Sequence, residues 1–162
     1  MRYRHQKGTT TVEFALVALV VLMMMFGVFE IGRGYYTYAM LDEVTRRGAR
    51  LASVCPINDP AIARLSIFGA AADPTSSGFI AGLTTANLAI DYLDAGNAVV
   101  AAPTEPDNFM RIRYVRARIV NFVFRVNLPF ITGLTNITMP AFEYILPRES
   151  LGVPRDGAIT PC

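Results

Sequence analysis

The chain has 162 residues, of which 52% are hydrophobic, with two cysteines and a formal net charge of +2. This length allows one modest domain and a membrane segment. Three of the 15 basic residues lie in the first eight positions, so the rest of the chain is nearly neutral and its charge does not indicate a nucleic-acid-binding protein. Two thiols and the single histidine, His5, are too few for a structural zinc site.

A long apolar segment follows the N-terminus, and residues 14–29 carry no charge. An apolar helix needs about 20 residues to cross a bilayer, and residues 14–32 supply nineteen, with Glu30 near the far end. Three basic residues, Arg2, Arg4 and Lys7, flank the near end, so the positive-inside rule predicts a cytoplasmic N-terminus. Everything after about Arg33 is then expected on the outer face of that membrane.

Three interpretations of this segment remain open. A cleaved secretory signal has a shorter apolar core than this one, followed by a cleavage site of small residues. Residues 32–36 do not provide such a cleavage site. A plain signal anchor explains the length and the basic flank, but it leaves Glu13 in hydrocarbon at a cost of a few kcal/mol. The third interpretation is a prepilin-type signal, which Gly8 to Phe14 resembles. In that class a membrane peptidase cuts after the glycine, and a glutamate stands at position five of the mature chain.

The prepilin interpretation gives Glu13 a use, because Thr9 becomes residue one and Glu13 becomes residue five. Cleavage after Gly8 would remove a basic leader, residues 1–8, and create a new α-amino group at Thr9. In a bundle of such helices, Glu13 can pair with the amine of a neighbouring subunit. A buried charge that is costly alone then disfavours the wrong stagger more than it adds stability.

The helix is expected to continue beyond the membrane. Two acid-first pairs at four-residue spacing support it: Asp42 with Arg46, and Glu43 with Arg47. A stripe at three- and four-residue steps predicts a buried face: Leu41, Val44, Gly48, Leu51 and Cys55. Pro56 ends the pattern. We therefore predict one helix over residues 9–54, roughly 70 Å long at about 1.5 Å per residue.

The remainder predicts short elements. Asp59-Pro60 is typical of a helix start and precedes a short helix over about 60–70, with Ile62, Leu65 and Phe68 on one side. Loops are predicted at 73–78 and 94–108, and a strand at 86–93.

Residues 109–126 predict a longer β segment, with a bulge at Tyr114-Val115 where the apolar parity switches. A last strand over 136–146 contains Pro140, which favours an edge position or a break. The fold class is therefore α+β: a long N-terminal helix, membrane-spanning in its first half, packed on a small antiparallel β-meander with one short extra helix.

No nucleophile elbow, phosphate loop, dinucleotide fingerprint or metal-spaced cluster is present, so we expect neither an enzyme nor a cofactor. Two pairs of acids, Asp91 with Asp94 and Glu105 with Asp107, could be called carboxylate pairs. Carboxylates are common on loops, so we expect no catalytic role for them. Four arginines alternate along the β segment, at 111, 113, 116 and 118, and fit either an anionic-ligand patch or a solvent-facing or edge-guarding row. Glu30 either pairs with Arg33 at i,i+3 or contacts a partner helix.

The N-terminal region also resembles a known family. The segment Thr11 to Val54 is similar to TadE-like proteins in three elements: Phe26-Gly27, Glu30 to Arg33, and Arg47 to Arg50. Farther along, the arginine-rich strand, Leu128-Pro129-Phe130 and Tyr144 to Pro147 have a similar layout. TadE-like proteins are minor pseudopilins of the tight-adherence (Tad or Flp) pilus. Phe14 stands where the main pilins usually carry tyrosine, and the outer domain is large; both features favour a minor component.

The resemblance implies a pilin-like structural protein that acts in pilus assembly, initiation or at the tip. It implies cleavage between Gly8 and Thr9 by a prepilin peptidase, with other pilins, pseudopilins and the Tad assembly machinery as partners. It places the chain in the inner membrane with a periplasmic C-terminal domain. The parts are then a leader (1–8), a transmembrane helix (9–32), its periplasmic extension (33–55) and an α+β domain (56–162). The alternative function is a membrane-anchored periplasmic binding module.

The two cysteines lie beyond the apolar segment. Cys55 ends the helical stripe and Cys162 is the last residue given, and we predict a disulfide between them in an oxidising compartment. Such a bond would close a loop of more than 100 residues and contribute roughly 4 kcal/mol in the chain-entropy model. Two free thiols are the alternative, because spacing alone does not fix the distance between them.

Overall fold

A computed structural model describes residues 9–126, 136–153 and 162. Nine elements are present in this part of the chain: α1 (Thr9–Val54), α2 (Pro60–Ser66), η1 (Thr85–Asn87), β1 (Leu88–Leu93), α3 (Pro106–Arg111), β2 (Tyr114–Ile119), β3 (Val123–Arg125), β4 (Asn136–Thr138) and β5 (Glu143–Pro147). The proposed leader (1–8), including Gly8, and the stretch Leu128-Pro129-Phe130 lie outside the described residues.

The chain divides into two compact units. The N-terminal unit contains the first part of α1, to Tyr36, together with described residues from 124 to 137. The sheet unit contains the rest of α1, from Thr37, and the remaining elements. Each unit is described by itself below.

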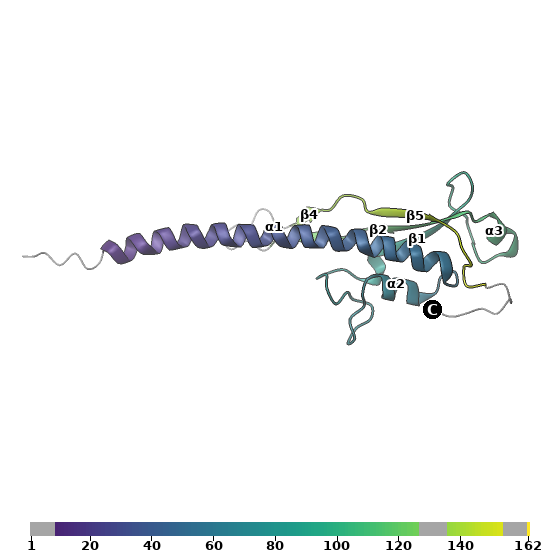
Figure 1. Cartoon of the computed structure of the whole chain (residues 1–162), viewed down its shortest axis with the longest axis horizontal. Helices are drawn as coiled ribbons and strands as arrows, with labels where there is room; N and C mark the ends of the chain where they lie inside the picture. Colours follow the sequence, from purple (N-terminus) through teal and green to yellow (C-terminus); the bar gives the residue numbers. More distant parts are fainter. Residues whose placement is uncertain (1–8, 127–135, 154–161) are drawn as a thin grey trace, which may run out of the picture. The chain divides into compact units, whose positions relative to one another are not determined.

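The predicted helix over 9–54 is confirmed, because α1 runs without interruption from Thr9 to Val54 (Figure 1). Its buried positions begin at Thr37 and lie at helical spacing in the sheet unit: Thr37, Leu41, Val44, Thr45, Gly48, Ala49, Ala52 and Ser53. The apolar side chains of the first part are exposed instead. Pro56 follows the end of the helix, since the residue before a proline is disfavoured in helical backbone.

Three strands of the sheet unit form an antiparallel sheet in the order β1-β2-β5, which confirms the α+β class. Strand alternation gives the central strand β2 two different faces. Val115 and Ala117 are buried, whereas Arg116 and Arg118 point to the other side. A second sheet of two strands, β3 and β4, lies between β2 and β5 in the sequence. The arrangement is therefore not a simple meander.

The second part of α1 packs closely on the buried face of the sheet. A Cβ atom placed on Gly48 would lie 3.3 Å from both the Ala117 Cβ and the Leu88 Cδ2 atoms, and 3.4 Å from the Ser66 hydroxyl. The absence of a side chain at Gly48 thus brings α1 against β1, β2 and the end of α2. Tyr38 also packs edge-on against Phe142, with ring centroids 4.9 Å apart.

One predicted strand is wrong at its start. Residues 106–111 form α3, whereas the sequence pattern predicted a loop up to 108 and a strand from 109. Pro106 occupies the first turn, where its missing N–H costs nothing, and Asp107 favours the same end of the helix. The parity switch at Tyr114 marks the start of β2 after this helix, so the predicted bulge is wrong as well.

Two further boundaries differ from the expectations. α2 ends at Ser66, because Phe68 adopts a left-handed backbone with φ of 54°, and the predicted stripe fails at Leu65, which is 41% exposed. Asp59 does cap this helix, and its carboxylate accepts from the Ala61 N–H. The predicted strand over 136–146 is broken around Pro140 into β4 and β5.

The C-terminal end of α1 is capped by a distant segment. The N–H groups of Glu149 and Leu151 donate to the Ser53 carbonyl, and that of Gly152 donates to the Val54 carbonyl. These bonds satisfy carbonyls that a helix end leaves without partners. Gly152 has a φ of 79° and a Cβ there would come within 2.6 Å of Pro56, so the approach requires glycine.

Candidate assembly and anchoring site

The residues of the predicted processing site lie at the start of α1. Thr9 is the first helical residue and Glu13 follows one turn later. Both side chains are exposed, and no ion pair of Glu13 is found within the described residues. Gly8, on the other side of the expected cut, lies outside them. The structure thus places the predicted residue one and residue five on one helix, with the carboxylate free to meet a group outside this chain.

An apolar surface continues from Glu13 along the N-terminal unit. α1 is the one helix among residues 9–126, 136–153 and 162 that is long and apolar enough to cross a membrane. Within its most apolar window no residue is buried inside the structure. Large side chains such as Phe14, Met24 and Phe29 are therefore available to lipid or to other helices. Such a helix fits a single-pass membrane anchor.

Glu30 and Arg33 form the expected i,i+3 pair at the end of the apolar segment. The Arg33 Nη2 atom donates to Glu30 Oε2 at 2.7 Å. The same guanidinium lies 4.3 Å from the centroid of the Phe124 ring and donates to the Arg125 carbonyl. Arg33 thus joins α1 to β3 inside the N-terminal unit. Sequence reasoning could not find this contact, because about ninety residues separate its partners.

The four arginines that suggested a ligand patch are dispersed. Arg116 and Arg118 both donate to Asp91 Oδ2 on the neighbouring strand β1, each at 2.9 Å. Arg111 lies in α3 and is 3.7 Å from the Asp94 carboxylate. β2 is the central strand of its sheet, so the edge-guarding interpretation of the row is wrong. The outer sheet face is a set of cross-strand ion pairs, and Asp91 is their shared acceptor.

The predicted disulfide is present. Cys55 and Cys162 are bonded, with Cα atoms 5.8 Å apart and a sequence separation of 107. Cys55 is fully buried in the core cluster with Ala52, Tyr92 and Val115. The bond therefore fastens the distal end of the described chain to the end of α1, beside the hydrogen bonds from residues 149–152.

The same core contains an isolated phenol. The Tyr92 hydroxyl is buried, and no described group makes a hydrogen bond to it. Burial raises the pKa of Tyr92 above its ordinary value of 10.0. The nearby Asn58 backbone lowers the pKa by a smaller amount, although it does not form a hydrogen bond with the hydroxyl. Tyr92 therefore acts as an apolar core residue that is held in its neutral form.

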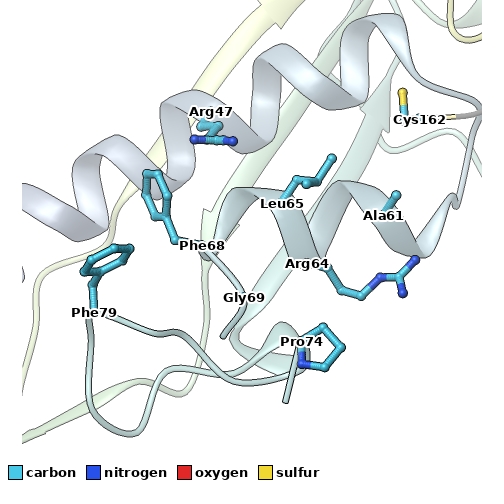
Figure 2. A pocket seen from close by; sticks show the side chains of 9 residues that line it. All are labelled: Arg47, Ala61, Arg64, Leu65, Phe68, Gly69, Pro74, Phe79 and Cys162. Atoms are coloured by element: carbon cyan, nitrogen blue, oxygen red, sulfur yellow. The ribbon is translucent and has the colours of Figure 1, made fainter. Parts of the chain in front are cut away.

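An open groove lies on the sheet unit between α1, α2 and the loop after α2 (Figure 2). It has a volume of about 570 Å³. Figure 2 shows Arg47 above Phe68 and Phe79 at one end of the groove, with Arg64 and Cys162 toward the other end. The Arg47 guanidinium lies 4.6 Å from the Phe68 ring centroid, and the two phenylalanine rings meet edge to face. The groove has the chemistry to hold an apolar group beside a negative charge.

Residues that could hold a metal do not converge in the described part of the chain, where no group of three or more His, Cys, Asp or Glu side chains occurs.

Comparisons with known proteins identify the N-terminal segment. Residues 8–50 match the family model described as TadE-like protein. The match covers Gly8, Thr9, Glu13, Glu30 and Arg33, and extends into the part of α1 that packs on the sheet. No curated protein and no solved structure matches the chain.

Proposed function

We propose that this chain, whose N-terminal segment is TadE-like and thereby points to the Tad pilus, is a minor pseudopilin that acts in pilus assembly, initiation or at the tip. One observation carries the proposal. The family match contains a glycine, a threonine and a glutamate in prepilin register, at the start of a helix whose most apolar segment has no buried residue. A helix of this kind suits both a bilayer and a bundle of similar helices.

The proposed maturation step is cleavage after Gly8 by a prepilin peptidase. The leader (1–8) is removed, and residues 9–32 remain as the transmembrane helix with a cytoplasmic N-terminus. Residues 33–55 extend the helix into the periplasm, and residues 56–162 form the periplasmic α+β domain. The flanking positive charges favour this orientation. The inner membrane, the peptidase, other pilins and pseudopilins, and the Tad assembly machinery are the proposed partners.

Glu13 is proposed to set the register of the assembled helices. A lone carboxylate in hydrocarbon costs up to about 3 kcal/mol on the insertion scale at the centre of a helix, and less near the end of the apolar segment, where Glu13 lies. The new α-amino group at Thr9 of a neighbour offers a partner of opposite charge at the same depth. A wrongly staggered neighbour leaves both charges unpaired, so the pair acts chiefly against wrong assembly.

A membrane-anchored periplasmic binding module is the second candidate. Its original support, the arginine row, is weakened because Arg116 and Arg118 are held by Asp91. The groove beside Arg47 is a better ligand site, since no ion pair of Arg47 occurs within the described residues. This candidate requires neither cleavage nor Glu13.

The experiment that separates the two candidates compares Glu13→Gln with Glu30→Gln in cells that make the pilus. Both variants remove one negative charge from an end of the apolar segment. Glu13→Gln should insert into the membrane normally and abolish or strongly reduce pilus formation. Glu30→Gln should assemble pili, because Glu30 is already paired with Arg33 in its own helix.

Membrane fractionation and counting of sheared pili give the two measurements. Normal piliation by Glu13→Gln would contradict the register role. Loss of piliation only in Glu30→Gln would instead assign the interface to the Glu30–Arg33 pair. Loss of membrane insertion in either variant would show that the charge affects the anchor rather than assembly.

A further inference from the structure

The end of the apolar segment defines a depth in the membrane. Residues 14–32 rise by roughly 28 Å at about 1.5 Å per residue, close to the ~30 Å thickness of the hydrocarbon core. Arg33 is the next residue, so the guanidinium lies at the hydrocarbon edge if α1 spans the bilayer. The headgroup layer beyond that edge is about 5–8 Å thick on each side. Any group in contact with Arg33 falls within this layer.

The β3–β4 ribbon, defined as β3 and β4 together, makes that contact. The Phe124 ring packs on the Arg33 guanidinium, and the Arg125 carbonyl accepts a hydrogen bond from it. A Cβ on Gly34 would lie 3.9 Å from the same ring, so the glycine lets the ribbon lie close to the helix. All of these contacts lie within the N-terminal unit. The depth of Arg33 thus fixes the depth of this part of the ribbon.

The side chains exposed at this level have the composition of a membrane interface. On α1, Tyr35 and Tyr36 are exposed, and tyrosine is enriched at headgroup depth because it combines an apolar ring with a polar tip. On the ribbon, Ile137 is 46% exposed, and Arg125 on the other strand of the two-stranded sheet is also exposed. An isoleucine can enter the acyl boundary, while an arginine can bind lipid phosphate.

We propose that the β3–β4 ribbon is a membrane-contact element that lies in the headgroup layer, in the leaflet on the C-terminal side of the α1 span, and binds glycerophospholipid through Ile137 and Arg125. The inference rests on the proposed membrane anchor and adds a second, monotopic contact to it. Charge complementarity supports lipid over a neutral surface, since the exposed side chain of Arg125 is cationic and lipid phosphates are anionic. The ribbon also contacts α1 at Arg33, the residue that follows the apolar segment of the helix.

Single tryptophans test the proposal cleanly, because the chain contains no tryptophan. The full-length Ile137→Trp protein is reconstituted in vesicles of phosphatidylcholine and phosphatidylglycerol. Spin-labelled lipids carry the quencher near the headgroup or near the acyl terminus. We expect emission shifted to shorter wavelength and strong quenching by the headgroup-proximal label only. The added change Arg125→Gln should reduce that quenching in these vesicles, and the reduction should disappear when phosphatidylglycerol is left out or the salt concentration is raised.

Two further variants control the experiment. Ile145→Trp replaces an isoleucine that is also in a strand and 43% exposed, but in the sheet unit, and it should stay unquenched. Met24→Trp, in the apolar segment, should be quenched by the acyl-terminal label. If Met24→Trp is not quenched, the membrane anchor itself is wrong.

If Met24→Trp is quenched and Ile137→Trp is not, only the ribbon proposal fails. A blue-shifted but unquenched Ile137→Trp would show that the ribbon contacts protein, such as a second copy of the chain, and would overturn the lipid assignment. Equal quenching of Ile145→Trp would also overturn it, because the signal would not be specific to the ribbon.

Discussion

The two parts of α1 belong to one uninterrupted helix but are specified in different ways. From Thr9 to Tyr36, large apolar side chains are exposed in every direction, and no single face is buried. From Thr37 to Val54, buried residues follow helical spacing and the remaining face carries charges such as Asp42 and Arg46. The first pattern suits a uniform apolar solvent, and the second suits one particular sheet.

Two glycines show the same difference within a single residue type. A Cβ on Gly27 would meet nothing within 4 Å, whereas a Cβ on Gly48 would meet three groups within 3.4 Å. The membrane part thus keeps its surfaces free for lipid or other subunits. The second part uses its buried face to pack on the sheet of the same chain. The predictions below test this division.

The largest effect is expected from loss of the disulfide at the C-terminal end of α1. Cys162→Ser removes the disulfide without emptying the buried Cys55 position. Because the bond closes a loop with a sequence separation of 107, the chain-entropy model predicts a loss of about 4 kcal/mol in the free energy of unfolding of the sheet unit. Denaturant unfolding of the detergent-solubilised chain, followed by near-ultraviolet circular dichroism, measures it.

Reductant provides the control for that prediction. It should lower the stability of the parent protein to that of Cys162→Ser and leave the variant unchanged. Membrane insertion should be the same in both. Alkylation of both thiols in the native, non-reduced protein would contradict the disulfide.

A smaller effect is expected from filling the space at Gly48. Gly48→Leu forces α1 away from Ala117 and Leu88, and overpacking of this kind costs about 1–3 kcal/mol. The matched variant Gly27→Leu should leave the unfolding midpoint of the sheet unit unchanged, since nothing lies near that position. Equal destabilisation by the two variants would show that the division of α1 is wrong.

The smallest effect is expected at Tyr92, in the core beneath the same part of α1. Tyr92→Phe removes a buried hydroxyl without a hydrogen-bond partner among the described residues, so stability near pH 7 should change by less than about 1 kcal/mol. Burial raises the folded-state pKa of Tyr92 above 10.0, so its contribution is complete below pH 10 and is lost as the pH rises through the folded pKa.

Thermal unfolding measured from neutral to strongly alkaline pH checks this expectation. The parent should lose stability more steeply above pH 10 than Tyr92→Phe. Identical alkaline profiles would mean that Tyr92 does not remain neutral in the folded core.

The sequence predicted those features that depend on local patterns. The bounds of α1 followed from an apolar run, a buried stripe and Pro56, and the Glu30–Arg33 pair followed from its spacing. The disulfide followed from there being only two cysteines. α3 was missed because arginines alternate with apolar residues from Met110 to Tyr114, and that alternation also fits a helix end followed by a strand.

Long-range contacts were beyond sequence reasoning for a different reason. The cation–π contact of Arg33 with Phe124, and the capping of α1 by residues 149–152, join parts of the chain that only tertiary folding brings together. No local propensity encodes such pairs. The arginine row was ambiguous for the same reason, since Asp91 neutralises it from another strand.

The proposed function depends most on the cut after Gly8, because the pairing of Glu13 requires an amine at Thr9. N-terminal sequencing of the protein purified from membranes tests it directly, with a Gly8-substituted variant as the uncleaved reference. We predict that the chain begins at Thr9 and that the reference keeps residues 1–8. A membrane protein that still begins at Met1 in cells that make the pilus would contradict the account.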